Sequence, residues 1–182
     1  EVKSIIIDGN GRIWATTLDN GIVVMDKNKK LLKQLQYDEN KKNSLKIRKV
    51  TSLQRGPDGY IWATGNGGIS RINPVTFAID NLEGSPLAVL DSFLTTPLLF
   101  IDNENIWVGT DGQGVFHFNI ASKKIRKYST ENGLVSNRLF AVNADKNGNI
   151  YMAGRGGLNI LFTNGKIKTF TENEGLLINR AE

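Results

Sequence analysis

One short motif occurs four times along the chain at nearly constant spacing. Each copy begins with an isoleucine that an aromatic residue follows, and the copies start at Ile13, Ile61, Ile106 and Ile150. Successive copies are 48, 45 and 44 residues apart, a period that matches one four-stranded blade of a β-propeller. A fixed repeat period indicates a repeat architecture more strongly than any local pattern does. The chain is therefore expected to consist of copies of one β unit.

Glycines around each copy predict where the strands of such a unit begin and end. Glycine stands two positions before the isoleucine in three copies, as Gly11, Gly59 and Gly148. Each follows Asn or Asp, and this pair predicts a two-residue primed hairpin turn between the first and second strands, from which the third copy departs with Asn103-Glu104. A further glycine, seven or eight residues after the isoleucine, marks the third strand.

The fourth strand of each unit has a weaker signal. Leu31, Leu32 and Leu35 could also face one side of a short helix, but register with the other copies favours a strand. In the second copy the strand is expected from Phe77 to Leu82.

The predicted fold is therefore all-β, with four consecutive four-stranded antiparallel propeller blades. The blades are expected at residues 2–37, 50–82, 95–129 and 139–171, with a linker at 172–182 that leads toward a missing blade. Because the chain stops where another inner strand should start, we expect residues 1–182 to be a fragment of a larger propeller.

The aromatic residue of each copy has an expected structural role. These residues are Trp14, Trp62, Trp107 and Tyr151. A single four-stranded sheet cannot cover both of its faces, whereas stacked blades cover each other. The four rings are therefore expected to pack between blades, where each removes on the order of 150–250 Å² of surface from water.

Composition excludes several classes of function. The chain has no cysteine, which rules out disulfides and cysteine-based metal sites. Its net charge of +5 is concentrated between Asp26 and Lys49, which favours a solvated loop over a nucleic-acid surface. No stretch approaches the roughly 20 apolar residues that cross a bilayer. Since the first residue is Glu1, we expect an excerpt of a longer chain, with any membrane span in the missing parts.

Catalytic and metal sites find little support. The single histidine, His117, lies between two phenylalanines on a third strand, where a core or edge role is favoured over catalysis. The glycine-rich segments 65–68 and 154–157 do not precede helices, so they indicate turns rather than phosphate sites. No dense oxygen-rich loop recurs in every copy. We therefore predict no catalytic residue, no metal and no cofactor.

The segment Asp58-Gly-Tyr-Ile-Trp-Ala-Thr-Gly-Asn-Gly-Gly-Ile69 resembles the two-component regulator propeller repeat. Residues 128–137 and 170–179 are similar to the family's aromatic, polar, Gly-Leu, Asn linker. Residues 84–87 depart from that linker, and Tyr151 replaces tryptophan. The resemblance implies the periplasmic sensor region of a Bacteroidetes-type hybrid histidine kinase in the inner membrane, a class that detects oligosaccharides. Streptogramin lyases resemble the chain only in their blade repeats, and their dependence on several histidines is not met.

Propellers bind ligands with loops at the ends of their central channel. The linkers into the inner strands and the turns between second and third strands share one face. Candidate ligand residues there are Arg48, Asn66, Asp111, Gln113, Asn137, Arg138, Arg155, Asn179 and Arg180, with Asp19 and Asn20 beside them. They suit sugar hydroxyls or carboxylates, since arginine binds carboxylate or sulfate bidentately.

Two other functions are open at this point. The chain could be a structural propeller that holds protein partners or, with less support, a propeller lyase or hydrolase. Exposed blade faces also predict a homodimer or another self-association through blade edges.

Overall fold

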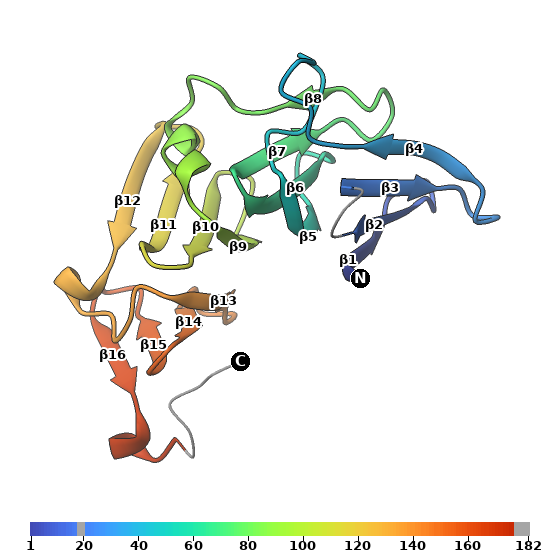
Figure 1. The fold of residues 1–182 in the computed structure, drawn as a ribbon. Coiled ribbons are helices and arrows are strands. Elements are labelled where there is room, and N and C mark those ends of the chain that lie inside the picture. The colour runs from blue at the N-terminus through green and yellow to red at the C-terminus, as the bar shows by residue number, and fades with distance from the viewer. Residues whose placement is uncertain (18–20, 177–182) are drawn as a thin grey trace. The chain divides into compact units, whose positions relative to one another are not determined.

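The computed structural model describes residues 1–17 and 21–176, and the chain divides into two compact units, Glu1–Thr95 and Thr96–Glu182. Four four-stranded antiparallel sheets follow one another along the chain, each with its strands in sequence order (Figure 1). This confirms the predicted all-β fold of consecutive propeller-blade modules.

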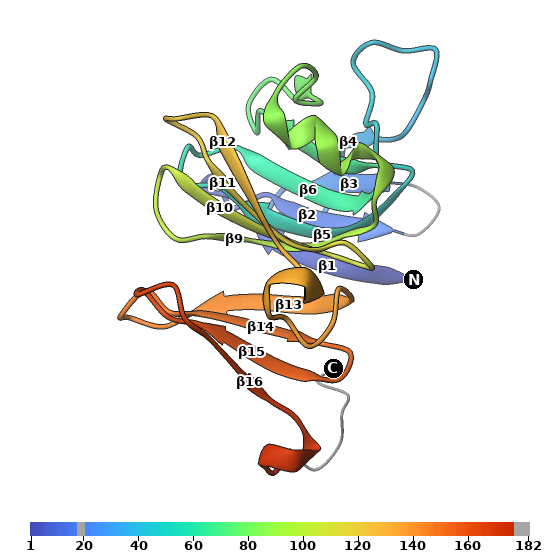
Figure 2. The same cartoon turned by 90° about the vertical axis from the view of Figure 1, so that its left-hand side faces the viewer.

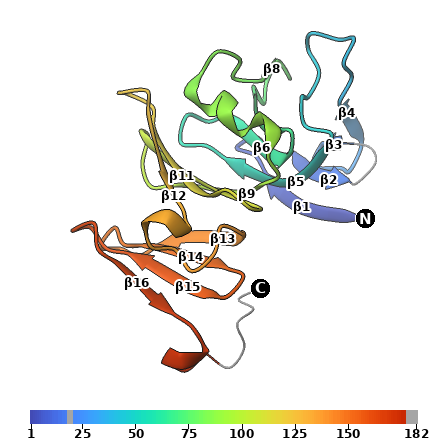
Figure 3. The same cartoon turned by 60° about the vertical axis from the view of Figure 1, so that its left-hand side comes forward.

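The first unit holds two of the sheets. One sheet consists of β1 (Val2–Ile7), β2 (Ile13–Thr17), β3 (Gly21–Met25) and β4 (Leu31–Leu35), and the other of β5 (Lys49–Arg55), β6 (Ile61–Asn66), β7 (Gly68–Ile72) and β8 (Ile79–Asp80). Because β4 pairs with β3, the helical alternative for this segment is wrong. A short 3-10 helix, η1 (Pro86–Ser92), follows β8 and packs on β7 (Figure 3).

The second unit repeats this arrangement. Its sheets are β9 (Thr95–Phe100), β10 (Asn105–Thr110), β11 (Gly114–Asn119) and β12 (Lys124–Tyr128), and then β13 (Leu139–Ala144), β14 (Ile150–Gly154), β15 (Gly157–Leu161) and β16 (Ile167–Phe170) (Figure 2). Two single-turn 3-10 helices, η2 (Thr130–Asn132) and η3 (Glu172–Glu174), follow β12 and β16. None of the described helices is long and apolar enough to cross a membrane.

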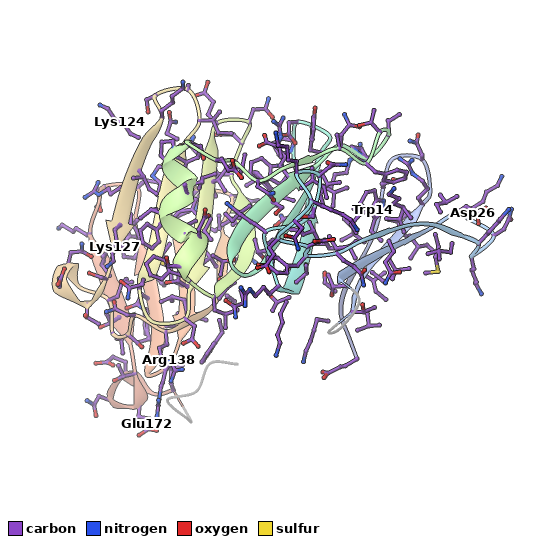
Figure 4. The ribbon with its side chains drawn as sticks, turned by 45° about the horizontal axis from the view of Figure 1, so that its top comes forward. Trp14, Asp26, Lys124, Lys127, Arg138 and Glu172 are labelled. Atoms are coloured by element: carbon purple, nitrogen blue, oxygen red, sulfur yellow. The ribbon has the colours of Figure 1, made fainter. Side chains whose placement is uncertain are left out.

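An aromatic ring lies in the core of each unit. In the first unit Trp14 of β2 is fully buried and shares one hydrophobic cluster with Val50 and Leu53 of β5 (Figure 4). In the second unit Trp107 of β10 shares a cluster with Ile150 and Met152 of β14. Within each unit, therefore, the ring joins residues of two successive sheets in one core.

The turns between first and second strands differ from the predicted type. Gly11, Gly59 and Gly148 have φ values of 75°, 79° and 83°, whereas the residues before them are not in the left-handed region. In the first sheet Asp8 N–H donates to the Arg12 carbonyl and Gly11 N–H to the Asp8 carbonyl, both at 3.0 Å. This is a three-residue loop with one left-handed glycine, so the prediction of a two-residue primed turn is wrong.

The carboxylate of Asp8 is hydrogen-bonded to this loop. It accepts the backbone N–H groups of Asn10 and Arg12 at 2.8 and 3.1 Å. It also accepts Trp14 Nε1 at 2.9 Å and Arg12 Nε at 2.7 Å. The turn thus fixes the buried ring as well as its own backbone.

Two other sheets make a similar contact between a turn carboxylate and the aromatic side chain. Trp62 Nε1 donates to Asp58 at 3.2 Å, and the Tyr151 hydroxyl donates to Asp145 at 3.2 Å. The third sheet departs from this pattern, because Asp102 accepts hydrogen bonds from Asn105 at 2.9 and 3.0 Å instead. Its Trp107 has no hydrogen-bond partner among residues 1–17 and 21–176.

The second sheet shows one further difference from expectation. Its fourth strand begins at Ile79 rather than at Phe77. Phe77 ends the preceding turn with a φ of 59°, and its ring lies 5.8 Å from that of Trp14. A residue assigned to a strand by alignment of the copies is therefore a turn residue whose side chain joins the core.

We predict that Asp8→Ala lowers the free energy of unfolding by about 2–4 kcal/mol, because it leaves the buried Trp14 N–H and the Arg12 guanidinium without their acceptor. Asp26→Ala is the matched control. Within the described part of the chain, Asp26 accepts only the backbone N–H groups of Asn28 and Lys30, in another turn of the same sheet, so its loss should be about 1 kcal/mol. Urea denaturation followed by tryptophan fluorescence measures both, and equal losses would contradict the role given to Asp8.

The same carboxylate predicts a pH dependence. Burial acts to raise the pKa of Asp8, but hydrogen bonds from Trp14 and Arg12 outweigh it and hold the pKa below its ordinary value. A carboxyl whose pKa is depressed by folding stabilises the fold above its unfolded pKa of about 3.9, and this stabilisation is lost as the pH falls through the folded pKa. Acid unfolding of Asp8→Ala should therefore depend less steeply on pH than that of the wild type.

Candidate functional site

The described candidate ligand residues fall into two groups, one in each unit. Arg48 and Asn66 belong to the first unit, and Asp111, Gln113, Asn137, Arg138 and Arg155 belong to the second. Asn179 and Arg180, like Asp19 and Asn20, lie outside the described residues.

An ion pair holds the second group together. Arg138 Nε lies 2.5 Å from Asp111 Oδ1, and its Nη2 lies 3.2 Å from Oδ2, so the guanidinium binds the carboxylate with two nitrogens (Figure 4). The same two residues form an isolated β-bridge through their backbones. This contact joins the turn after β10 to the segment that leads into β13. Two sheets of the second unit therefore fix the position of the pair.

Backbone hydrogen bonds extend this connection. Gly112 and Gly114 both donate their N–H to the Asn137 carbonyl, at 3.0 and 2.8 Å, and Arg155 N–H donates to the Arg138 carbonyl at 2.9 Å. The turns after β10 and β14 thus both attach to the linker before β13. The structure therefore brings Asp111, Asn137, Arg138 and Arg155, four of the candidate ligand residues, together at this linker.

The amide side chains of the group are largely engaged within the protein. Asn137 Oδ1 accepts Thr130 N–H at 2.8 Å and its Nδ2 donates to the Thr130 hydroxyl at 3.2 Å. Gln113 Oε1 accepts Lys127 Nζ at 3.1 Å. Arg155 is exposed, and its guanidinium has no hydrogen bond or ion pair within the described part of the chain. Of the group, Arg155 is the side chain most available to a ligand.

Electrostatics favour a partner with negative or hydroxyl groups. The hydrogen bond from Arg138 holds the pKa of Asp111 below its ordinary value, and the same contact raises the pKa of Arg138. Asp111 therefore stays ionised and is neutralised by Arg138, which leaves Arg155 and Lys127 as positive charges of the group. A carboxylate, a sulfate or a set of sugar hydroxyls matches this arrangement.

In the first unit Arg48 is stacked on an aromatic ring. Its guanidinium carbon lies 4.9 Å from the centroid of the Tyr37 ring, and its Nη2 lies 3.2 Å from the Tyr37 hydroxyl. Arg48 N–H donates to the Asn66 carbonyl at 3.0 Å, so the two predicted residues are neighbours. Tyr37 is a member that the sequence analysis missed. The register of the copies gave no signal for it, because Leu35, not Tyr37, pairs with Ile22 as Tyr128 pairs with Val115.

Solved structures of known proteins share this arrangement of sheets. The extracellular domain assigned to the hybrid two component system BT3049 from B. thetaiotaomicron is 25% identical, with a TM-score of 0.78 over 98% of this chain and 23% of that chain. The extracellular domain of BT4673 from the same organism is 14% identical, with a TM-score of 0.78 over 96% and 25%. Virginiamycin B lyase from Staphylococcus aureus is 17% identical, with a TM-score of 0.66 over 93% and 55%.

These likenesses differ in what they show. The chain spans about a quarter of the length of the two extracellular domains, and its likeness to the first supports a sensing role outside the cytoplasm. The likenesses to BT4673 and to the lyase show the fold alone. No curated protein matches the chain. One protein family matches residues 1–166, and the chain belongs to it: the family described as Domain of unknown function (DUF5074).

Proposed function

We propose that this chain is a non-catalytic, ligand-sensing part of the periplasmic region of a two-component receptor, and that its ligand is an oligosaccharide. The observation that carries the proposal is the 25% identity to the extracellular domain of BT3049 over 98% of the chain. In this proposal the parent receptor is a histidine kinase of the inner membrane, and its other parts supply the membrane span.

The geometry of the second unit supports a ligand at the Asp111–Arg138 pair. Backbone hydrogen bonds from two turns fix this pair to the linker before β13, and rigid sheets that present polar loops are a common setting for binding sites. Sugar hydroxyls can donate to the Asp111 carboxylate and accept from arginine. Arg155 adds a positive charge with no partner in the described residues.

The side chains also support a non-catalytic role. Lyase or hydrolase chemistry needs a positioned base or nucleophile pair. His117, the only histidine in the sequence, is hydrogen-bonded to Asn105 at 2.9 Å. Among the described residues, no three His, Cys, Asp or Glu side chains are grouped so that they could hold a metal ion. The likeness to virginiamycin B lyase, at 17% identity, brings no catalytic assignment to this chain.

Self-association stays a prediction. The apolar side chains of Val2, Ile5 and Ile7 on β1 are exposed by 52%, 61% and 66%. The equivalent of Ile5 in the second sheet, Leu53, is buried against the first sheet. A homodimer, or another blade of the parent receptor, would cover the exposed side chains of β1 in the same way.

We predict that the whole receptor domain binds an oligosaccharide and that Arg138→Lys weakens binding by about tenfold, because lysine keeps the charge but not the two-nitrogen contact with Asp111. Isothermal titration calorimetry with neutral, uronate-containing and sulfated oligosaccharides measures the affinity. Lys146→Ala, an exposed lysine in the turn after β13, is the control and should bind as the wild type does.

Three outcomes would count against the proposal. Absence of heat with every oligosaccharide in the panel would refute the carbohydrate ligand. Stable capture of a protein partner under those conditions, with no small-molecule response, would favour the interaction-propeller alternative. If Arg138→Lys and Lys146→Ala bound equally well, the ligand would lie elsewhere on the domain.

A further inference from the structure

A cavity of about 320 Å³ opens between the two sheets of the second unit. Asn105, Trp107, His117 and Arg126 of the β9–β12 sheet line one side. The other side is formed by Ile150 and Leu161 of the β13–β16 sheet and by residues of its turns. None of the described ligand residues predicted from the sequence lines this cavity.

The cavity is separate from the Asp111–Arg138 pair. Strand β10 begins at Asn105, which lines the cavity, and ends at Thr110, directly before Asp111. The two places therefore lie at opposite ends of the same strand. A ligand in the cavity would contact the β13–β14 turn and the β15–β16 turn. It would not contact the turn that holds Asp111.

Strand pairing builds a cationic and aromatic wall on one side of the cavity. His117 pairs with Trp107 on β10 and with Arg126 on β12, so the three side chains form one row on the same face of the sheet. The His117 ring stacks on Trp107 with centroids 4.4 Å apart and planes 11° apart. The Arg126 guanidinium carbon lies 4.9 Å from the centroid of the Tyr128 ring.

Several donors of this wall lack an acceptor in the described part of the chain. Arg126 has no ion pair or hydrogen bond there, and neither does the indole N–H of Trp107. His117 uses Nε2 with Asn105, which leaves Nδ1 as a donor when the imidazole is protonated. Among the described residues no carboxylate lines the cavity, although the charge of the nearby Asp102, which accepts from Asn105, acts on His117. The wall therefore offers unpaired donors to a ligand, and Arg126 is the positive charge among them.

A single turn position explains why the cavity is open. The turn between third and fourth strands carries a residue with positive φ in every sheet, namely Lys29, Phe77, Lys123 and Gly165. In the first unit Phe77 packs on Trp14, and the Arg12 guanidinium carbon lies 5.6 Å from the centroid of its ring. In the second unit that position is Gly165, and nothing lies within 4 Å of where its Cβ would be. The space that a phenylalanine side chain occupies in one unit is left open in the other.

We propose that this cavity binds one sugar ring that carries a carboxylate, with the carboxylate on Arg126 and His117 and the ring against Ile150, Leu161 and the turn of Gly165. The Arg126 guanidinium gives strong charge-assisted hydrogen bonds to a carboxylate, and the imidazole of His117 adds a second charged donor when it is protonated. Its volume lies at the low end of the about 300–1,000 Å³ of small-molecule sites, which suits a single ring rather than a chain of sugars. This site does not depend on the signalling role proposed above.

Titration of the full chain with glucuronate, followed by NMR, tests the proposal. His117 is the only histidine, so its imidazole signals are unambiguous. Glucuronate should shift them saturably, with affinity in the millimolar range. Glucose, which has the ring without the charge, and acetate, which has the charge without the ring, should each bind at least about tenfold more weakly.

Two pairs of variants locate the ligand. Arg126→Met should weaken glucuronate binding by at least about tenfold. Lys168→Met is the control and should bind normally, because Lys168 of β16 has the same charge but pairs with Ile160, and neither residue lines the cavity. Gly165→Phe introduces the side chain that Phe77 supplies in the first unit and should abolish binding. Gly11→Phe is its control, since Gly11 is an equally open turn position with φ of 75° in the other unit.

The pKa of His117 provides a readout that does not depend on affinity. Burial lowers this pKa, the charge of Arg126 lowers it further, and Asp102 acts to raise it. The free protein should therefore titrate below the ordinary histidine value of about 6.5. Saturating glucuronate should raise the pKa because it adds a negative charge beside the imidazole, and Arg126→Met should raise it in the free protein because it removes a positive one.

Three results would overturn the proposal. The first is no saturable shift of the His117 signals at any soluble concentration of glucuronate. The second is an equal loss of affinity in Arg126→Met and Lys168→Met, which would indicate a general charge effect. The third is normal binding by Gly165→Phe when circular dichroism shows that the variant is folded. A lack of oligosaccharide response by the whole receptor would leave this site unaffected.

Discussion

The structure depends on how an aromatic ring is held between two successive sheets. A four-stranded sheet has two faces, and within the first unit Trp14 of one sheet and Val50 of the next bury those faces in a common core. An indole N–H in such a core needs an acceptor, and Asp8 supplies it from the turn that precedes the strand of Trp14. Asp8 is itself buried and also binds Arg12, so one carboxylate connects the turn, the ring and the guanidinium.

The period of the repeat was sufficient to predict the sheets but not their turns. Four units of four antiparallel strands follow from the spacing of the Ile-aromatic motif, and register against the other copies assigned β4 correctly where local propensity favoured a helix. The turn before Trp14 was predicted one residue too short, because an Asn-Gly pair also fits a three-residue loop in which only the glycine is left-handed. Phe77 was assigned to a strand for a similar reason, since alignment of copies does not show which turn residue points into the core.

The candidate site was predictable only in part. Asp111 and Arg138 stand at a turn and at the following linker, so consecutive blades bring them near each other, and the structure pairs them. The engagement of Gln113 by Lys127 and of Asn137 by Thr130 could not be predicted, because these contacts depend on how the linker folds. The cavity beside His117 is harder still to predict, since it arises where one copy of the repeat lacks a side chain that another copy has.

The left-handed position at the end of the β15–β16 turn has a consequence for how such proteins diversify. The backbone there accepts lysine, phenylalanine or glycine in different sheets, and the third strand pairs with the fourth in every sheet. A single codon at this position could therefore close or open a chamber between two sheets while the hydrogen-bonded framework stays intact. Each pair of neighbouring sheets in a repeat array could gain or lose a ligand cavity independently of the other pairs. One scaffold could then carry several unrelated binding sites.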